Sequence, residues 1–191
     1  MRKLTFLVIV SFGLLCYTCV QESNNLVLHA QHNELVLNNG VLMYMGRPFN
    51  GMLLDYYSNG AKRMEVMYHD GRKHGIEIQW YDNGTVATTR NYLNGKKSGL
   101  HQGYWENGNY KFVYHFNSHG AYHGNIKEWY SSGALMRDFN YMNGKENGTQ
   151  KMWMQNGKIR ANYEVVNGER FGLIGLKKCY QVSSNTNIKE L

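Results

Sequence analysis

The chain has 191 residues, of which 42% are hydrophobic, 14% aromatic and 18% charged, and its formal net charge at pH 7 is +7. This aromatic content, with so few charges, excludes a chain that is disordered throughout, because disordered chains are poor in aromatic residues and rich in charge. The length fits one domain or one short array of repeats.

The first 19 residues are typical of a targeting segment. Arg2 and Lys3 precede an apolar run over residues 4–15, and a short basic region before such a run is the pattern of a secretory signal. We therefore expect export and removal of this segment. After residue 20 no apolar run approaches the ~20 residues that span a bilayer.

Two cysteines lie at the end of this segment. The arrangement resembles a bacterial lipoprotein signal, which implies that Cys19 is lipidated and becomes the mature N-terminus. In the usual lipobox an aliphatic and a small residue stand where this chain has Cys16 and Thr18. A lipidated Cys19 predicts a protein anchored to a membrane of the cell envelope. The alternative is a soluble secreted chain in which Cys19 pairs with Cys179.

Glycines recur at a period of 24 or 25 residues. Three series share this period, and one insertion between Gly108 and Gly120 accounts for every 25-residue step. The first series is Gly51, Gly75, Gly99, Gly124, Gly148 and Gly172; the second is Gly60, Gly84, Gly108, Gly133 and Gly157; the third is Gly71, Gly95, Gly120, Gly144 and Gly168. Such self-similarity is the signature of a repeat protein. We number the units from Gly51.

Each unit predicts a strand, a tight turn, a strand and a second tight turn. Most glycines of the second and third series follow Asn or Asp, as in Asn59-Gly60 and Asn94-Gly95. A two-residue type I′ turn needs positive φ at both central residues, which Asn and Gly tolerate best. We therefore expect type I′ turns at both places. The predicted fold is all-β, an elongated antiparallel meander of stacked hairpins.

Aromatic residues keep register with the glycines. Four residues before the second-series glycines stand Tyr56, Trp80, Tyr104, Trp129 and Trp153, and directly after the first four of these stand Tyr57, Tyr81, Trp105 and Tyr130. Neighbouring residues of a strand point to opposite faces of the sheet. The sequence therefore predicts two aromatic ladders, one on each face.

This pattern of Gly, paired aromatics and Asn-Gly resembles the MORN repeat in its bacterial variant form. Its clearest copies are residues 75–84 and 124–133. The resemblance implies a ribbon of hairpins over residues 47–172, an N-terminal cap and partial repeat over 20–46, and a C-terminal cap and polar tail over 173–191. Bacterial proteins of this kind are often assigned to the YwqK-like family of proposed antitoxins, which implies a toxin or a neighbouring protein as partner.

Catalytic patterns are missing from the sequence. The glycines fall at turns, the carboxylates are scattered, and no nucleophile stands with a base. His115, His119 and His123 share a four-residue spacing, but we interpret His119 and His123 as turn residues because each precedes a glycine. We expect no enzyme activity, no metal and no cofactor.

Two sets of residues are candidates for binding. A row of basic residues follows the third-series glycines, and an anionic lipid or an acidic protein could bind it; the alternative is protection of a sheet edge. Exposed aromatic residues could bind a protein, or could only hold the ribbon together. The basic candidates are Arg72, Lys73, Lys96, Lys97 and Lys145, and the aromatic candidates are Trp80, Tyr104, Trp105, Trp129 and Trp153.

These observations favour an exported scaffold for protein–protein interaction, with an antitoxin or immunity-like role as one form of it. The alternative is a peripheral module that binds anionic membrane lipid through its basic edge. Nucleic acid is not an expected partner, because the charge excess is small and the protein carries an export signal.

Overall fold

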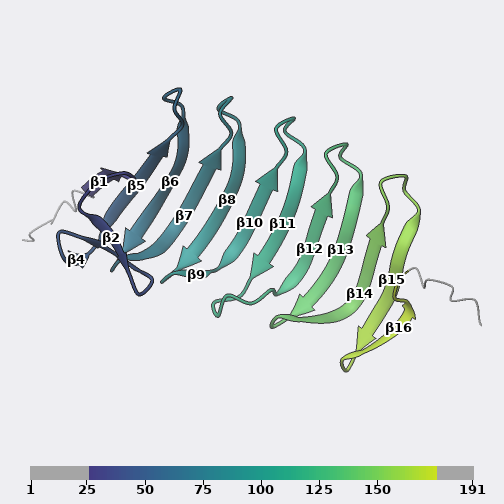
Figure 1. Cartoon of the computed structure of the whole chain (residues 1–191). Helices are drawn as coiled ribbons and strands as arrows, with labels where there is room; N and C mark the ends of the chain where they lie inside the picture. The colour runs from purple at the N-terminus through teal and green to yellow at the C-terminus, as the bar shows by residue number, and fades with distance from the viewer. Residues whose placement is uncertain (1–25, 176–191) are drawn as a thin grey trace, which may run out of the picture.

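A computed structural model describes residues 26–175 of the chain (Figure 1). The predictions for the targeting segment, for Cys19 and for Cys179 fall outside the described residues. Within residues 26–175 there is no helix, and so none that could cross a membrane.

The described residues form strands joined by short turns. Twelve strands follow one another across the main sheet in the order β1-β5-β6-β7-β8-β10-β11-β12-β13-β14-β15-β16, β9 pairs with β8, and β2-β3-β4 form a small separate sheet. Their bounds are β1 (Leu26–His29), β2 (Leu35–Asn38), β3 (Val41–Tyr44), β4 (Arg47–Pro48), β5 (Gly51–Tyr56), β6 (Lys62–His69), β7 (Arg72–Trp80), β8 (Val86–Leu93), β9 (Lys96–Lys97), β10 (Gly99–Tyr104), β11 (Tyr110–Phe116), β12 (Gly124–Trp129), β13 (Leu135–Met142), β14 (Lys145–Trp153), β15 (Ile159–Val166) and β16 (Glu169–Leu173).

The predicted all-β meander is confirmed. From β5 onward the strands of the main sheet pair antiparallel in chain order, and they lie side by side along one twisted ribbon (Figure 1). Each unit therefore contacts mainly its neighbours, as in other repeat arrays. The described core is correspondingly divided, with one cluster around Val66 near the N-terminal end and another around Tyr163 near the C-terminal end.

The N-terminal end departs from the predicted antiparallel pattern. Strand β1 pairs parallel with β5, with Leu26 opposite Gly51, and a Cβ at Gly51 would lie 2.0 Å from the Leu26 carbonyl oxygen. Phe49 is buried between Tyr44 and Tyr68. These contacts close this end of the array. By contrast, all residues of β16 at the other end are exposed.

The third-series turns are of type I′, as predicted, in four units. Both central residues have positive φ at Asp70-Gly71, Asn94-Gly95, Asn143-Gly144 and Asn167-Gly168. The two-residue loops join β6 to β7, β8 to β9, β13 to β14 and β15 to β16.

The prediction of type I′ turns at the second-series glycines was wrong. There only the glycine has positive φ, and the Asn does not. In the first unit Tyr57 N–H donates to the Ala61 carbonyl, and Gly60 N–H donates to the Tyr57 carbonyl, both at 2.9 Å. This is a three-residue loop, a type I turn that ends in a left-handed glycine. The Asn59 side chain stabilises it by accepting a hydrogen bond from Ala61 N–H at 2.9 Å.

The extra residue of the third unit is absorbed by a change of turn type. Its third turn is also a three-residue loop, in which Asn117 N–H donates to the Ala121 carbonyl and Gly120 N–H to the Asn117 carbonyl. A three-residue loop has one residue more than a type I′ loop. The insertion therefore lengthens one turn and leaves the pairing of β11 with β12 intact.

Cross-strand register defines two faces of the ribbon. One row of register partners carries the most buried residues, and we call its side the inner face: Leu53, Val66, Glu77, Arg90, His101, Tyr114, Ile126, Phe139, Gln150 and Tyr163. Residues one position away along each strand point to the opposite side, the outer face.

Candidate interaction surfaces

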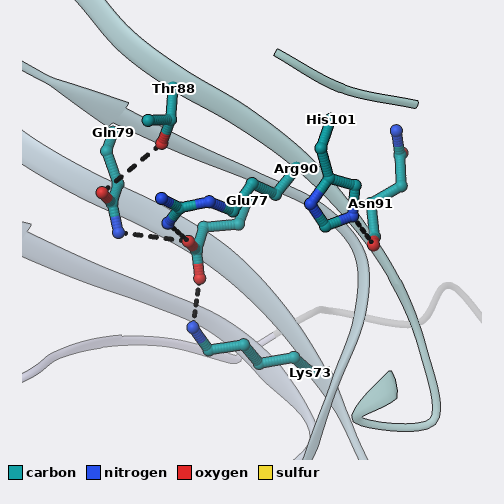
Figure 2. A network of polar contacts seen from close by, with 7 residues as sticks. All are labelled: Lys73, Glu77, Gln79, Thr88, Arg90, Asn91 and His101. Atoms are coloured by element: carbon teal, nitrogen blue, oxygen red, sulfur yellow. Dashed lines mark hydrogen bonds and ion pairs between the residues drawn. The ribbon is translucent and has the colours of Figure 1, made fainter. Parts of the chain in front are cut away.

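The inner face of the second unit is built around a buried carboxylate. Glu77 has no exposed surface and accepts hydrogen bonds from Lys73 Nζ, from Arg90 at 3.0 Å and from Gln79 at 3.1 Å (Figure 2). The Lys73 ammonium also lies 5.1 Å from the centre of the Tyr92 ring. Because a buried charge is tolerated only when it is paired and hydrogen-bonded, this cluster is a structural element of the ribbon.

Next along the row stands a buried histidine. The His101 ring packs 4.5 Å from the centre of the Phe116 ring, and its Nε2 lies 2.7 Å from the Asn91 carbonyl oxygen (Figure 2). A carbonyl can only accept, so Nε2 carries the proton of the neutral ring. Burial lowers the pKa of His101, and the Lys97 and Arg90 charges act in the same direction. The net effect favours the neutral form of the ring.

The fourth unit places apolar residues where the second has charges. Ile126 takes the place of Glu77, Phe139 that of Arg90, and Tyr122 that of Lys73. The Tyr122 ring stacks on Phe116 with the ring centres 4.7 Å apart. One framework thus accepts two different sets of inner residues.

The basic residues expected to form a row do not all have the same surroundings. Lys73 turns inward to Glu77, and the Lys97 ammonium lies 5.3 Å from the centre of the Phe116 ring. Arg72, Lys96, Lys97 and Lys145 are exposed at the turn ends of their strands. Of the five predicted basic residues, only Lys73 is therefore withdrawn from the exposed row.

One aromatic ladder lies on the outer face. Each of its members pairs across strands with a residue of the following strand: Tyr56 with Lys62, Trp80 with Val86, Tyr104 with Tyr110, Trp129 with Leu135, and Trp153 with Ile159. The aromatic members are half-buried, whereas Tyr110 is 44% and Ile159 48% exposed. The ladder and its partners form an outer stripe that is apolar except at Lys62 and runs the length of the ribbon.

The outer face beside this stripe differs between the second and third units and the fourth and fifth units. In the second and third units it carries apolar side chains, with Ile76 54% and Leu100 38% exposed. The corresponding residues of the fourth and fifth units are Asn125 and Thr149. We call the N-terminal part the apolar patch, defined by Ile76, Ile78, Trp80, Val86, Leu100, Tyr104 and Tyr110.

The second aromatic ladder connects neighbouring units on the inner face. Each member donates a hydrogen bond to a backbone carbonyl of the next unit: Tyr57 to Trp80 at 2.8 Å, Tyr81 to Tyr104 at 2.8 Å, Trp105 to Trp129 at 3.1 Å and Tyr130 to Trp153 at 3.0 Å. We call these four bonds the rungs. Trp105 therefore lies apart from the other four aromatic candidates, which are all on the outer face.

Sequence reasoning missed the buried polar residues of the inner row. A signal was present, since Leu53, Glu77, His101, Ile126 and Gln150 all stand two residues after a first-series glycine. No group of three His, Cys, Asp or Glu side chains in residues 26–175 could hold a metal ion. The candidate sites in residues 26–175 are therefore surfaces along the two faces of the sheet.

Comparison with known proteins supports this architecture. No curated protein matches the sequence. Residues 73–94, which span most of β7 and all of β8, match the family described as MORN repeat variant. The chain thus contains a MORN repeat variant at residues 73–94 within an all-β ribbon of MORN type.

Proposed function

We propose that this protein is a non-enzymatic scaffold that binds a partner protein through the apolar patch. The observation that supports it is the outer face of the second and third units, where the exposed Ile76, Val86, Leu100 and Tyr110 lie beside the aromatic ladder. A second group of exposed apolar residues, Ile159, Val166, Phe171 and Leu173, lies at the C-terminal end of the ribbon. Contiguous exposed apolar surface is a common mark of protein interfaces, and aromatic side chains contribute strongly to their binding energy.

The cellular setting belongs to the same proposal. Export and lipidation at Cys19 would place the ribbon at a membrane of the cell envelope. A YwqK-like antitoxin role would make the partner a toxin, and an exported chain fits an immunity-like role in the envelope.

Crosslinking in the native cell tests this proposal. The tagged full-length chain is crosslinked, and its partners are identified by mass spectrometry, together with fractionation of the envelope. We expect one stoichiometric partner that is lost in the double variant Ile76→Asp, Leu100→Asp. Both side chains are exposed, so the variant should still fold.

Thr149→Asp is the matched control, because Thr149 occupies the corresponding exposed position of the fifth unit. It should keep the partner. A partner retained by the double variant, or the absence of any stoichiometric partner, would contradict the proposal.

Binding to anionic lipid is the second candidate, supported by the exposed Arg72, Lys96, Lys97 and Lys145. It predicts that the chain, with its N-terminal cysteines changed to serine, still binds vesicles with anionic lipid. Charge reversal at Lys96 and Lys97 should abolish this binding. A chain that stays soluble with such vesicles argues against it.

A further inference from the structure

Two hollows lie on either side of the Trp105 side chain. One, of about 330 Å³, includes Trp105, Lys111, Tyr130 and Gln155 in its lining. The other, of about 430 Å³, is lined by Tyr81, Trp105, Glu106, Asn107 and Ser131. Ser131 and Trp105 belong to both linings, so the two hollows adjoin each other in the third and fourth units, and we call the pair the groove.

The aromatic side chains of this groove are held in place before any ligand arrives. Tyr81, Trp105 and Tyr130 each donate a hydrogen bond to a carbonyl of the next unit. Since one unit is two strands wide, these side chains recur at about 10 Å intervals. Fixed aromatic rings at a regular spacing suit a linear ligand that is itself periodic.

Polar groups with free bonding capacity stand beside the rings. Glu106 and Gln155 line the two hollows, are exposed and form no side-chain hydrogen bond with other described residues. Glu128 accepts hydrogen bonds from Tyr114 and Arg137 through one oxygen, Oε1. The groove therefore combines ring faces with groups that can bond hydroxyls and amides.

The remaining features disfavour two other ligand classes. Strands β10, β11 and β12 are paired on both sides, so the groove offers no free edge to which a peptide strand could be added. The Lys111 ammonium lies 4.4 Å from the centre of the Trp105 ring and repels a cationic ligand from it. Lys111 does not line the second hollow, so the face of Trp105 that borders this hollow is the one on which a neutral ligand would pack.

We propose that this groove binds a linear glycan of pyranose rings with equatorial substituents. The C–H groups on the face of such a ring carry partial positive charge and pack on the negative face of an aromatic ring. Its hydroxyl and acetamido groups would bond to Glu106, Gln155 and the free oxygen of Glu128. None of the seven residues that define the apolar patch lines the two hollows, although Trp129 of the outer ladder does.

Nuclear magnetic resonance provides the test. The chain has four tryptophans, so its spectrum has four indole N–H signals, each assignable by a Trp→Phe variant. The probes are the β-1,4-linked hexamers of N-acetylglucosamine and of glucose. We expect one or both probes to shift the Trp105 signal in a saturable manner and to leave the Trp80 and Trp153 signals unchanged.

Variants separate a binding role from a structural one. Gln155→Ala removes an exposed polar group and leaves the rungs intact, and we expect it to weaken binding about three- to tenfold. Trp80→Leu, on the outer face, should bind as the parent does. If neither hexamer moves the Trp105 signal at millimolar concentration, if Gln155→Ala binds unchanged, or if only a peptide shifts Trp105, the proposal is overturned. Loss of the crosslinked partner in the apolar-patch variant tests the other face and leaves this result unaffected.

Discussion

The second and fourth units solve the same packing problem in opposite ways. In the second unit, Glu77 is buried at the centre of the inner face and is bonded to Lys73 and Arg90. In the fourth, Ile126 is buried at the same position between aromatic residues. Both units keep their strands in register. The framework is therefore set by turns, bulges and rungs that these two units share, while the inner residues need only be mutually consistent.

The largest effect is expected when the central inner residue of the second unit is placed in the fourth unit without its partners. Ile126→Glu places a carboxylate where Phe139 and Tyr122 stand in place of the cations of the second unit, and Arg137, which lies over the Phe139 ring, is already paired with Glu128. We expect the free energy of unfolding in urea to fall by about 4 kcal/mol or more. Ile76→Glu, at an exposed outer position, should change it by less than about 0.5 kcal/mol. Equal effects of the two variants would show that the inner face is not a core.

The converse test removes the charge of the second unit. Glu77→Ala leaves Lys73 and Arg90 without their shared acceptor, and because both cations are partly exposed we expect a loss of about 2–3 kcal/mol. Replacing the whole cluster by that of the fourth unit, Lys73→Tyr, Glu77→Ile and Arg90→Phe, should recover most of it, since hydrophobic replacement of a buried ion pair is often neutral. Urea titration measures both. A triple variant less stable than Glu77→Ala would show that the clusters are not interchangeable.

The third unit, between these two, should respond to pH through His101. Burial lowers the pKa of this residue in the folded protein, so the unfolded chain binds the proton first as the pH falls. The His101 contribution to stability is therefore complete above about pH 6.5 and is lost as the pH falls from there toward the folded-state pKa. Thermal unfolding from pH 8 to pH 5 should show this slope, and His101→Gln, which copies Gln150 of the fifth unit, should flatten it. If the pH dependence of thermal stability were the same in His101→Gln as in the parent, other titrating groups would be its cause.

The smallest expected effect concerns the rungs, which the two kinds of unit share. Tyr81→Phe and Tyr130→Phe each remove one hydroxyl bond, to Tyr104 and Trp153 respectively. Each should cost about 1 kcal/mol, and the two costs should add because the sites are far apart. Melting of the single and double variants measures this. If the two single variants lost clearly different amounts of stability, the contribution of a rung would depend on the inner residues of its unit.

Much of this fold could be predicted because glycines and aromatic residues recur with the period of the repeat. The two strands of each unit, their antiparallel order and the opposite faces of the two ladders follow from the period and from alternation. Turn types did not follow, since Asn59-Gly60 and Asn94-Gly95 have the same letters and different backbone angles. What separates them is the register of the flanking strands, which is a tertiary property.

The interaction surfaces were harder to predict than the framework. Periodicity places Lys73 in a basic row, but only the position of Glu77 across the inner face shows that Lys73 is bonded inward. The parallel pairing of β1 with β5 had no sequence signal, because local patterns do not encode the direction in which distant strands meet.

The rungs give the array a direction. Every donor belongs to one unit and every acceptor to the unit that follows it in the chain. During synthesis from the N-terminus, a completed hairpin therefore waits for its successor to emerge before its aromatic donor is satisfied. Assembly of the ribbon is in this sense vectorial, and each newly made unit secures the one before it.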